Sequence, residues 1–138
     1  MQTELQKTLA KIAPNIFIQT IWDDDPDAWS EWRELSKPGN CFEGESREDW
    51  QSWQSEIRAA CICDGRKITG SAYLGGTWEK AGDNPALSNP EISGYERQMT
   101  EEALEELLNE MPIIGIDGNA APLRAQIDKA IAHLSTLN

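Results

Sequence analysis

Two extended segments joined by Asp64-Gly65 constrain the fold of this chain more than any other feature. The runs Ile57–Cys63 and Arg66–Leu74 are each typical of a β-strand. The Asp-Gly dipeptide suits a two-residue type I′ turn, because both central residues of that turn need positive φ. The sequence therefore predicts a β-hairpin over about residues 57–74. A hairpin alone is not stable in water, so we expect other elements to cover it.

The rest of the chain predicts further strands and helices around this hairpin. Residues 15–22 are rich in β-branched and aromatic side chains and are typical of a strand, and residues 113–116 suggest a short one. Glycine, asparagine and proline in the segment 80–95 predict a loop. Helical spacing, caps and prolines predict five helices: residues 3–12, about 26–36, a segment through Trp50 and Trp53 opened by Ser46, a helix capped by Thr100 and ended by Pro112, and one from Pro122 onward.

Together these elements predict an α+β fold. We expect a small antiparallel sheet, including the hairpin, packed against amphipathic helices. In the helix after Thr100, the apolar stripe consists of Ala103, Leu104, Leu107, Leu108 and Met111. In the last helix, the inward residues are Leu123, Ile127, Ala130, Ile131 and Leu134. With 138 residues, the chain has the length of a single domain over residues 1–138.

The chain is strongly acidic. Its 24 Asp and Glu residues against 12 Lys and Arg give a formal charge of −12, which repels nucleic-acid backbones and excludes direct nucleic-acid binding as the main activity. No apolar run approaches the roughly 18 residues of a membrane span, and the first residues lack the pattern of a secretory signal. We therefore expect a cytoplasmic protein without membrane contact. Its three cysteines are expected to be free thiols, with Cys61 and Cys63 on one face of the hairpin.

The acidic residues are concentrated in two segments of the chain, which we call the two acidic blocks. Residues 22–60 hold eleven acids against four bases, and residues 79–110 hold nine acids against two. Carboxylates spaced like phosphates could occupy the basic groove of a nucleic-acid-binding protein. The alternative is that the acid only keeps the chain soluble. The two hypotheses differ in what they expect of the fold. Mimicry expects both acidic blocks on one face of the molecule, whereas a solubilising role does not.

Six tryptophans are many for this length, and Trp29 and Trp32 lie inside the more N-terminal acidic block. Indoles at this spacing are either core residues or anchors for a basic, partly apolar protein partner. The candidate partner-binding residues are therefore Asp23, Asp24, Asp25, Asp27, Trp29, Glu31, Trp32, Glu34, Glu101, Glu102, Glu105 and Glu106.

Metal binding is a weaker alternative. Asp23, Asp25, Asp27 and Glu34 match four positions of a calcium-binding EF-hand loop, but Ala28 replaces the required glycine. Three cysteines and His133 lack the usual spacing of a structural zinc site. We therefore expect no metal and no other cofactor.

No catalytic motif stands out. His133 lies between apolar residues of the last helix, and no G-x-S-x-G or similar nucleophile motif accompanies it. The glycines of Gly75-Gly76 and Asp117-Gly118 suit turns rather than a phosphate-binding loop. The sequence therefore predicts that the protein is not an enzyme.

Three segments carry a resemblance to known proteins. The sequences Gly70–Glu79, Gly94–Leu104 and Asp23–Asp27 are similar to those of small uncharacterised accessory proteins encoded by phages and plasmids. Tyr73–Glu79 with Leu87-Ser88-Asn89 also resembles the Y-x-G-G-x-W-E…L-S-N segment of a plasmid antirestriction family. The resemblance implies an accessory protein of a mobile element and assigns no functional residues.

Two hypotheses follow from these patterns. In the first, the protein is a non-enzymatic accessory protein whose acidic surface binds and inhibits a host nucleic-acid-binding protein, as a DNA mimic or anti-defence protein does. In the second, it is a small structural or regulatory protein–protein interaction module whose acidity is only solubilising. Binding that weakens steeply as salt rises would favour the first hypothesis.

Overall fold

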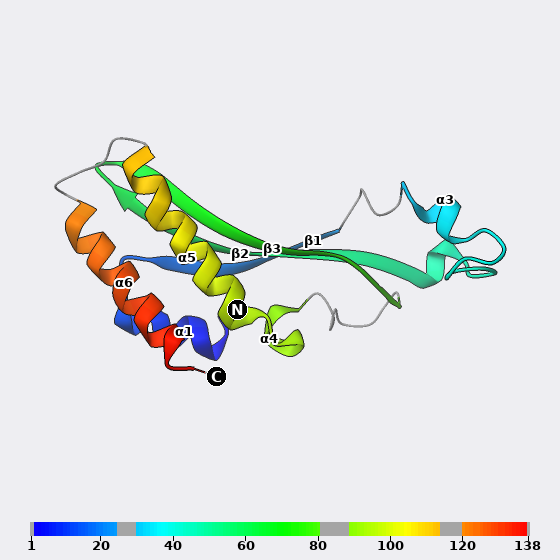
Figure 1. Cartoon of the computed structure of the whole chain (residues 1–138), viewed down its shortest axis with the longest axis horizontal. Helices are drawn as coiled ribbons and strands as arrows, with labels where there is room; N and C mark the ends of the chain where they lie inside the picture. The colour runs from blue at the N-terminus through cyan, green and yellow to red at the C-terminus, as the bar shows by residue number, and fades with distance from the viewer. Residues whose placement is uncertain (1, 25–29, 81–88, 114–119, 138) are drawn as a thin grey trace.

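A computed structural model of the chain describes residues 2–24, 30–80, 89–113 and 120–137. Its strands form one antiparallel sheet in the order β1-β2-β3, with bounds β1 Phe17–Asp24, β2 Trp50–Cys63 and β3 Arg66–Lys80. The helices are α1 Glu4–Ile12, α3 Trp32–Leu35, α4 Pro90–Ser93, α5 Glu96–Ile113 and α6 Ala121–Ser135, with a short 3₁₀ helix η1 over Arg47–Asp49 (Figure 1). The predicted α+β class with a small antiparallel sheet is confirmed.

The hairpin turn is the one predicted from Asp64-Gly65. Asp64 has φ of 52° and Gly65 of 76°, so both central residues have the positive φ of a type I′ turn. The paired strands are longer than predicted, because the register continues from Cys63↔Arg66 to Trp50↔Lys80. The helix predicted through Trp50 and Trp53 is wrong. Ser46 makes no side-chain cap bond, and pairing with β3 holds this segment as a strand.

Helices α1, α5 and α6 cover one face of the sheet (Figure 1). Alternate sheet residues point toward them, including Ile57, Ala59 and Cys61 of β2. Cys63 is buried on this same face, as its spacing from Cys61 predicts. The core also contains Leu9 of α1, the α5 residues Met99, Ala103, Leu104, Leu107 and Met111, and the α6 residues Leu123, Ile127, Ala130 and Leu134. The amphipathic stripes predicted for the last two helices are thus confirmed, although Leu108 and Ile131 are only partly buried.

Several element ends differ from the predictions. Helix α5 begins at Glu96, so Thr100 lies inside it and is fully buried; its hydroxyl donates to the Glu96 carbonyl at 2.7 Å instead of capping the helix. α5 also continues past Pro112 to Ile113. The segment predicted as a loop contains α4, which Asn89 caps by accepting hydrogen bonds from the Glu91 and Ile92 amides.

Two other predictions fall partly outside the described residues. Of the helix predicted over about 26–36, only Trp32–Leu35 is described as helical. The strand predicted over 113–116 has one described residue, Ile113, which is helical. In the N-terminal part, α1 confirms the first predicted helix, and β1 extends to Asp24 rather than ending at Asp23.

The sheet extends beyond its helical layer. Figure 1 shows β2 and β3 running away from α5 and α6, with α3 at the distant end. We call residues 30–49, which include α3 and η1 at this end, the arm tip. The β2–β3 register shifts between Trp53 and Ser55, which is the mark of a β-bulge a few residues from the start of β2. The molecule therefore presents two separate parts, a helix-covered body and a projecting arm.

Candidate partner-binding surfaces

The solvent side of α5 is lined with carboxylates. We call Glu101, Glu102, Glu105, Glu106 and Glu110 the α5 acidic face. Glu102, Glu105 and Glu106 are exposed, whereas Glu101 and Glu110 are half-buried. The apolar stripe of the same helix is buried against the sheet, so the periodicity of the sequence turns these glutamates outward.

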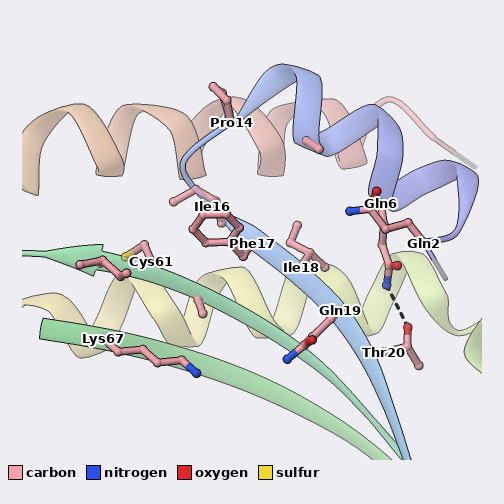
Figure 2. Close-up of a pocket in the computed structure, with 13 residues that line it drawn as sticks. Gln2, Gln6, Pro14, Ile16, Phe17, Ile18, Gln19, Thr20, Cys61 and Lys67 are labelled. Carbon is pink, nitrogen blue, oxygen red and sulfur yellow. Dashed lines mark hydrogen bonds between the residues drawn. The ribbon is translucent and has the colours of Figure 1, made fainter.

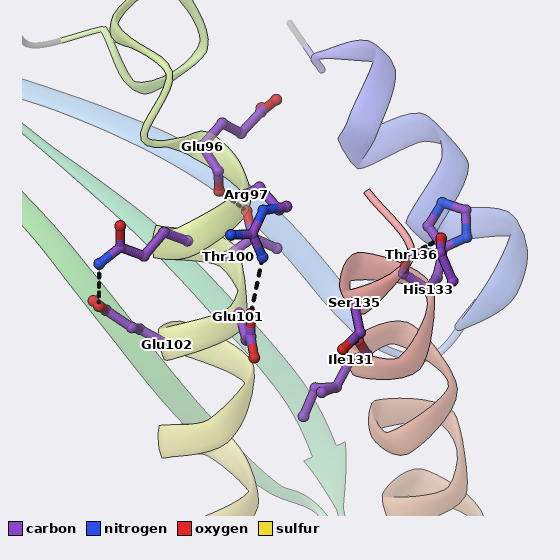
Figure 3. A network of polar contacts seen from close by, with 10 residues as sticks. Glu96, Arg97, Thr100, Glu101, Glu102, Ile131, His133, Ser135 and Thr136 are labelled. Carbon is purple, nitrogen blue, oxygen red and sulfur yellow. Dashed lines mark hydrogen bonds and ion pairs between the residues drawn. The ribbon is translucent and has the colours of Figure 1, made fainter. Parts of the chain in front are cut away.

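Few positive charges balance this face. Arg97 is the only basic residue in α5, and its Nη1 donates to Glu101 at 3.2 Å (Figure 3). Gln98 donates to Glu102 at 3.3 Å, which positions that carboxylate without neutralising it. Glu96 is not part of the face: burial raises the pKa of its carboxyl, and one of its oxygens is buried. The neighbouring helices differ from α5, because α1 and α6 each contain more basic than acidic residues.

The arm tip combines acid with aromatic side chains. The rings of Trp32 and Phe42 stack with centroids 5.3 Å apart, and the ring of Phe42 lies 4.8 Å from that of Trp50. The Trp50 indole N–H donates to the Glu45 carboxylate at 3.0 Å. None of the described residues of the arm tip is buried, and Trp50, which follows it at the start of β2, is also only partly buried, so this aromatic cluster is half-exposed. The same segment contains exposed acids: Glu31, Glu34, Glu43, Glu45, Glu48 and Asp49.

The structure separates the candidate residues into two groups. Glu101, Glu102, Glu105 and Glu106 lie together on α5, whereas Glu31, Trp32 and Glu34 lie in the arm tip, at the opposite end of the molecule (Figure 1). The two acidic blocks therefore do not form one continuous face among the described residues, so a DNA-mimicking surface cannot combine them there and would have to lie on one block alone. Asp23 and Asp24 end strand β1, where they pair with Gln54 and Trp53. Asp25, Asp27 and Trp29 lie outside the described residues.

Phe42 and Trp50 are the residues that sequence reasoning missed. The local sequence predicts a helix at Trp50, and Phe42 carries no pattern of its own. Trp32, Phe42 and Trp50 do not lie on one helix or strand, so only the folding of the tip brings them together. A signal was available in the composition, because these aromatic residues stand in a segment with few aliphatic ones.

The other face of the sheet carries no helix within the described part of the chain. Phe17, Ile62 and Tyr73 project from it and are 60%, 64% and 71% exposed. Between them, Arg58 Nε and Ser71 Oγ both donate to the Glu56 carboxylate, at 2.6 and 2.7 Å. Burial acts to raise the pKa of Glu56, but these hydrogen bonds and the Arg58 charge outweigh it and hold the pKa below its usual value. This face is therefore mixed apolar and polar rather than acidic.

The structure offers little for metal or thiol chemistry. Within the described ranges, no group of three His, Cys, Asp or Glu side chains is arranged to hold a metal ion. All three cysteines are free; Cys41 is exposed, and burial raises the pKa of Cys61 to about 11. A thiol with so high a pKa is a poor nucleophile at neutral pH. None of the described helices has the length and apolar character needed to cross a bilayer.

Comparisons with protein-family models, with curated proteins and with solved structures found no match. The charge and geometry of these surfaces therefore carry the functional proposal. The resemblance to phage and plasmid accessory proteins remains a hypothesis.

Proposed function

We propose that this protein is a non-enzymatic inhibitor whose α5 acidic face occupies the basic groove of a nucleic-acid-binding protein. The observation that supports this best is the run of five carboxylates from Glu101 to Glu110, with no basic residue between them. An α-helix rises about 1.5 Å per residue, so these five charges lie within about 13.5 Å along the helix axis, at unequal intervals of about 1.5–6 Å whose mean is about 3.4 Å. One strand of DNA presents its phosphates at about the same interval, 3.4 Å.

A rigid support makes this charge array suitable for binding. The buried side chains of Leu104 and Leu107 anchor α5 on the sheet, so the backbone that carries the carboxylates does not have to be ordered when a partner binds. Lys and Arg side chains that neutralise phosphates would meet a similar density of negative charge. The field of a chain with charge −12 also steers a basic partner toward this surface, and salt screens that attraction.

The resemblance to mobile-element proteins suggests where such a partner occurs. An accessory protein of a phage or plasmid acts in the cytoplasm of a bacterial host. The partner would then be a basic host enzyme that acts on nucleic acid, for example a restriction or other defence enzyme.

The arm tip favours a second candidate function. Its half-exposed cluster of Trp32, Phe42 and Trp50 is of the residue types that anchor protein–protein interfaces. In this case the chain is a structural or regulatory interaction module, and its acid is solubilising. Contact through these rings would be insensitive to salt.

An affinity experiment separates the two functions. The full chain is immobilised, a bacterial lysate is passed over it at low salt, and bound proteins are eluted with high salt and identified by mass spectrometry. We expect basic nucleic-acid-binding proteins that also leave the column when duplex DNA is added. The activity of each purified partner is then assayed with and without the protein, and unchanged activity contradicts inhibition.

Matched charge variants locate the surface. In the first variant, Glu102, Glu105 and Glu106 are replaced by glutamine. In the second, three exposed arm-tip residues, Glu31, Glu43 and Glu48, are replaced in the same way, so both variants lose the same charge. We expect only the α5 variant to lose most of its DNA-competed binding. Equal losses in both variants would contradict a specific role for α5, and salt-resistant capture that requires Trp32 would favour the interaction module.

A further inference from the structure

The two edge strands of the sheet, β1 and β3, have different neighbours. Helix α5 packs on β3, where the Ser71 N–H donates to the Glu106 carboxylate at 3.4 Å. Strand β1 forms the opposite edge, and no described strand pairs with its outer side. An unpaired strand edge presents free N–H and C=O groups and is a template for another strand.

The free edge has room for a partner. A groove of about 750 Å³ is lined by Gln6, Ala10 and Pro14 on the α1 side and by residues 16–20 of β1, and it continues over residues 60–62 of β2 and Lys67 of β3 (Figure 2). Gln6 Nε2 donates to Thr20 Oγ1 at 2.9 Å and fixes α1 above β1. The groove remains open beside this bond, so the helix does not fill the space next to the strand.

The edge also lacks the usual protection against pairing. Natural edge strands are protected by lysine, proline or a bulge. The residues from Phe17 to Trp22 include none of these, and their register with β2 is regular. Acid occurs only at the end of the strand, at Asp23 and Asp24.

We propose that β1 pairs antiparallel with β1 of a second copy of the chain, about a two-fold axis through Gln19 and perpendicular to the sheet. Such an axis leaves the side chains of both copies on the sheet faces that they already occupy. The sequence numbers of two opposed residues therefore differ by an even number. With the axis at Gln19, Phe17 faces Ile21 and Ile18 faces Thr20. Moving it to Thr20 would place Phe17 opposite Asp23. Moving it to Ile18 would shift Pro14, which has no N–H to donate, from opposite Asp24 at the strand end to opposite Trp22, and would shorten the paired segment.

The absence of charge at this edge permits a second copy to approach it. Two chains of charge −12 repel each other, so they can associate only where acid is sparse. Residues 16–22 contain no charged side chain, and the antiparallel arrangement places Asp23 and Asp24 of the two copies at opposite ends of the junction. The α5 helices lie over β3, at the two outer edges of the resulting six-stranded sheet. Both α5 acidic faces then lie on the same side of the dimer. The pairing itself does not depend on the proposed function.

The oligomeric state of the full chain tests the proposal. Sedimentation velocity and light scattering over a hundredfold range of concentration should show a mass approaching twice 15.4 kDa. Gln19→Lys places two lysines opposite each other at the axis and should give a monomer. Tyr73→Lys is the matched control, because Tyr73 is exposed on the same face but on the opposite edge strand. A monomer at every concentration would overturn the proposal, as would a dimer that only Tyr73→Lys dissociates.

A cysteine pair tests the register. In a Cys41→Ser background, which removes the exposed native thiol, Gln19→Cys should form a disulfide-linked dimer under mild oxidation. Opposed residues of antiparallel strands have Cα atoms about 4.5–5.5 Å apart, within reach of a disulfide. Phe17→Cys is the control, because its two copies would be offset by about 13 Å along the strands. Cross-linking of Phe17→Cys as readily as of Gln19→Cys would contradict the register.

Discussion

Gly70 lies so close to Leu107 that a Cβ on the glycine would overlap the backbone of the helical residue. The same atom would overlap the Ala103 carbonyl oxygen, so α5 lies directly on β3 at this point. The contact sets the height of α5 above the sheet and thereby the position of the α5 acidic face. Backbone on both sides leaves no flexible side chain that could move aside.

We predict that Gly70→Ala destabilises the fold by about 1–3 kcal/mol, the usual cost of overpacking. The sign of this change in stability is informative, because replacing a strand glycine with alanine elsewhere is usually stabilising. The free energy of unfolding from urea titration measures the change. Thr69→Ala, one residue away on the open face, is the control and should have a much smaller effect. Equal stability of Gly70→Ala and the native chain would mean that α5 moves freely on the sheet.

Local sequence signals predict the elements whose geometry is local. Asp64-Gly65 has a turn conformation that few other dipeptides adopt, and the Leu104–Leu107 stripe has a clear helical period. The strand at Trp50 could not be predicted in this way, because its conformation depends on pairing with Lys80, thirty residues away. The exposure of Glu102 and Glu106 follows from the same stripe. That the two acidic blocks lie apart depends on the length of the hairpin, which no local pattern encodes.

The arm tip should be less stable than the body. Its aromatic cluster around Phe42 has no buried residue, whereas Leu104 of α5 is fully buried in the core. We expect Phe42→Ala to speed amide hydrogen exchange in residues 30–49 and to leave exchange in the body unchanged. Leu104→Ala should cost about 2–5 kcal/mol of global stability and speed exchange throughout. Exchange by mass spectrometry with peptide resolution measures both. If Phe42→Ala also speeds exchange at Ile57, then the tip and body unfold together.

Burial of Cys61 should make the folded state less stable as the pH becomes alkaline. Its pKa is raised to about 11, whereas an unfolded cysteine has a pKa near 8.5. Between these values the unfolded chain releases a proton that the folded chain keeps. The stability due to this group is therefore full below about pH 8.5 and is lost as pH rises toward 11.

We expect Cys61→Ala to lose less stability than the native chain between pH 8 and pH 10, whatever its stability at pH 8. Urea titrations under reducing conditions at the two pH values give the difference for each protein. Cys63, also buried, remains in both proteins and cancels in the comparison. Equal losses would mean that the Cys61 thiol ionises normally in the folded state.

The α5 acidic face should reduce stability in the absence of a partner. Glu101 and Glu105, Glu102 and Glu106, and Glu106 and Glu110 are like-charge pairs one helical turn apart. Each such pair destabilises a helix by about 0.2–0.5 kcal/mol. Replacing Glu102, Glu105 and Glu106 with glutamine removes these repulsions and also that of the i,i+3 pair Glu102 and Glu105. The glutamine introduced by Glu106→Gln can still accept the Ser71 N–H through its side-chain oxygen.

We therefore predict that this triple variant is more stable than the native chain by about 0.5–1.5 kcal/mol at low salt. The gain should shrink at high salt, because salt already screens the repulsion in the native chain. Urea titration at both salt concentrations measures it, and the arm-tip variant at Glu31, Glu43 and Glu48 is the control for general charge. A variant that gains stability and loses DNA-competed binding would show that the carboxylates serve binding at a cost to the fold. A variant that loses stability would instead indicate that these glutamates support the structure.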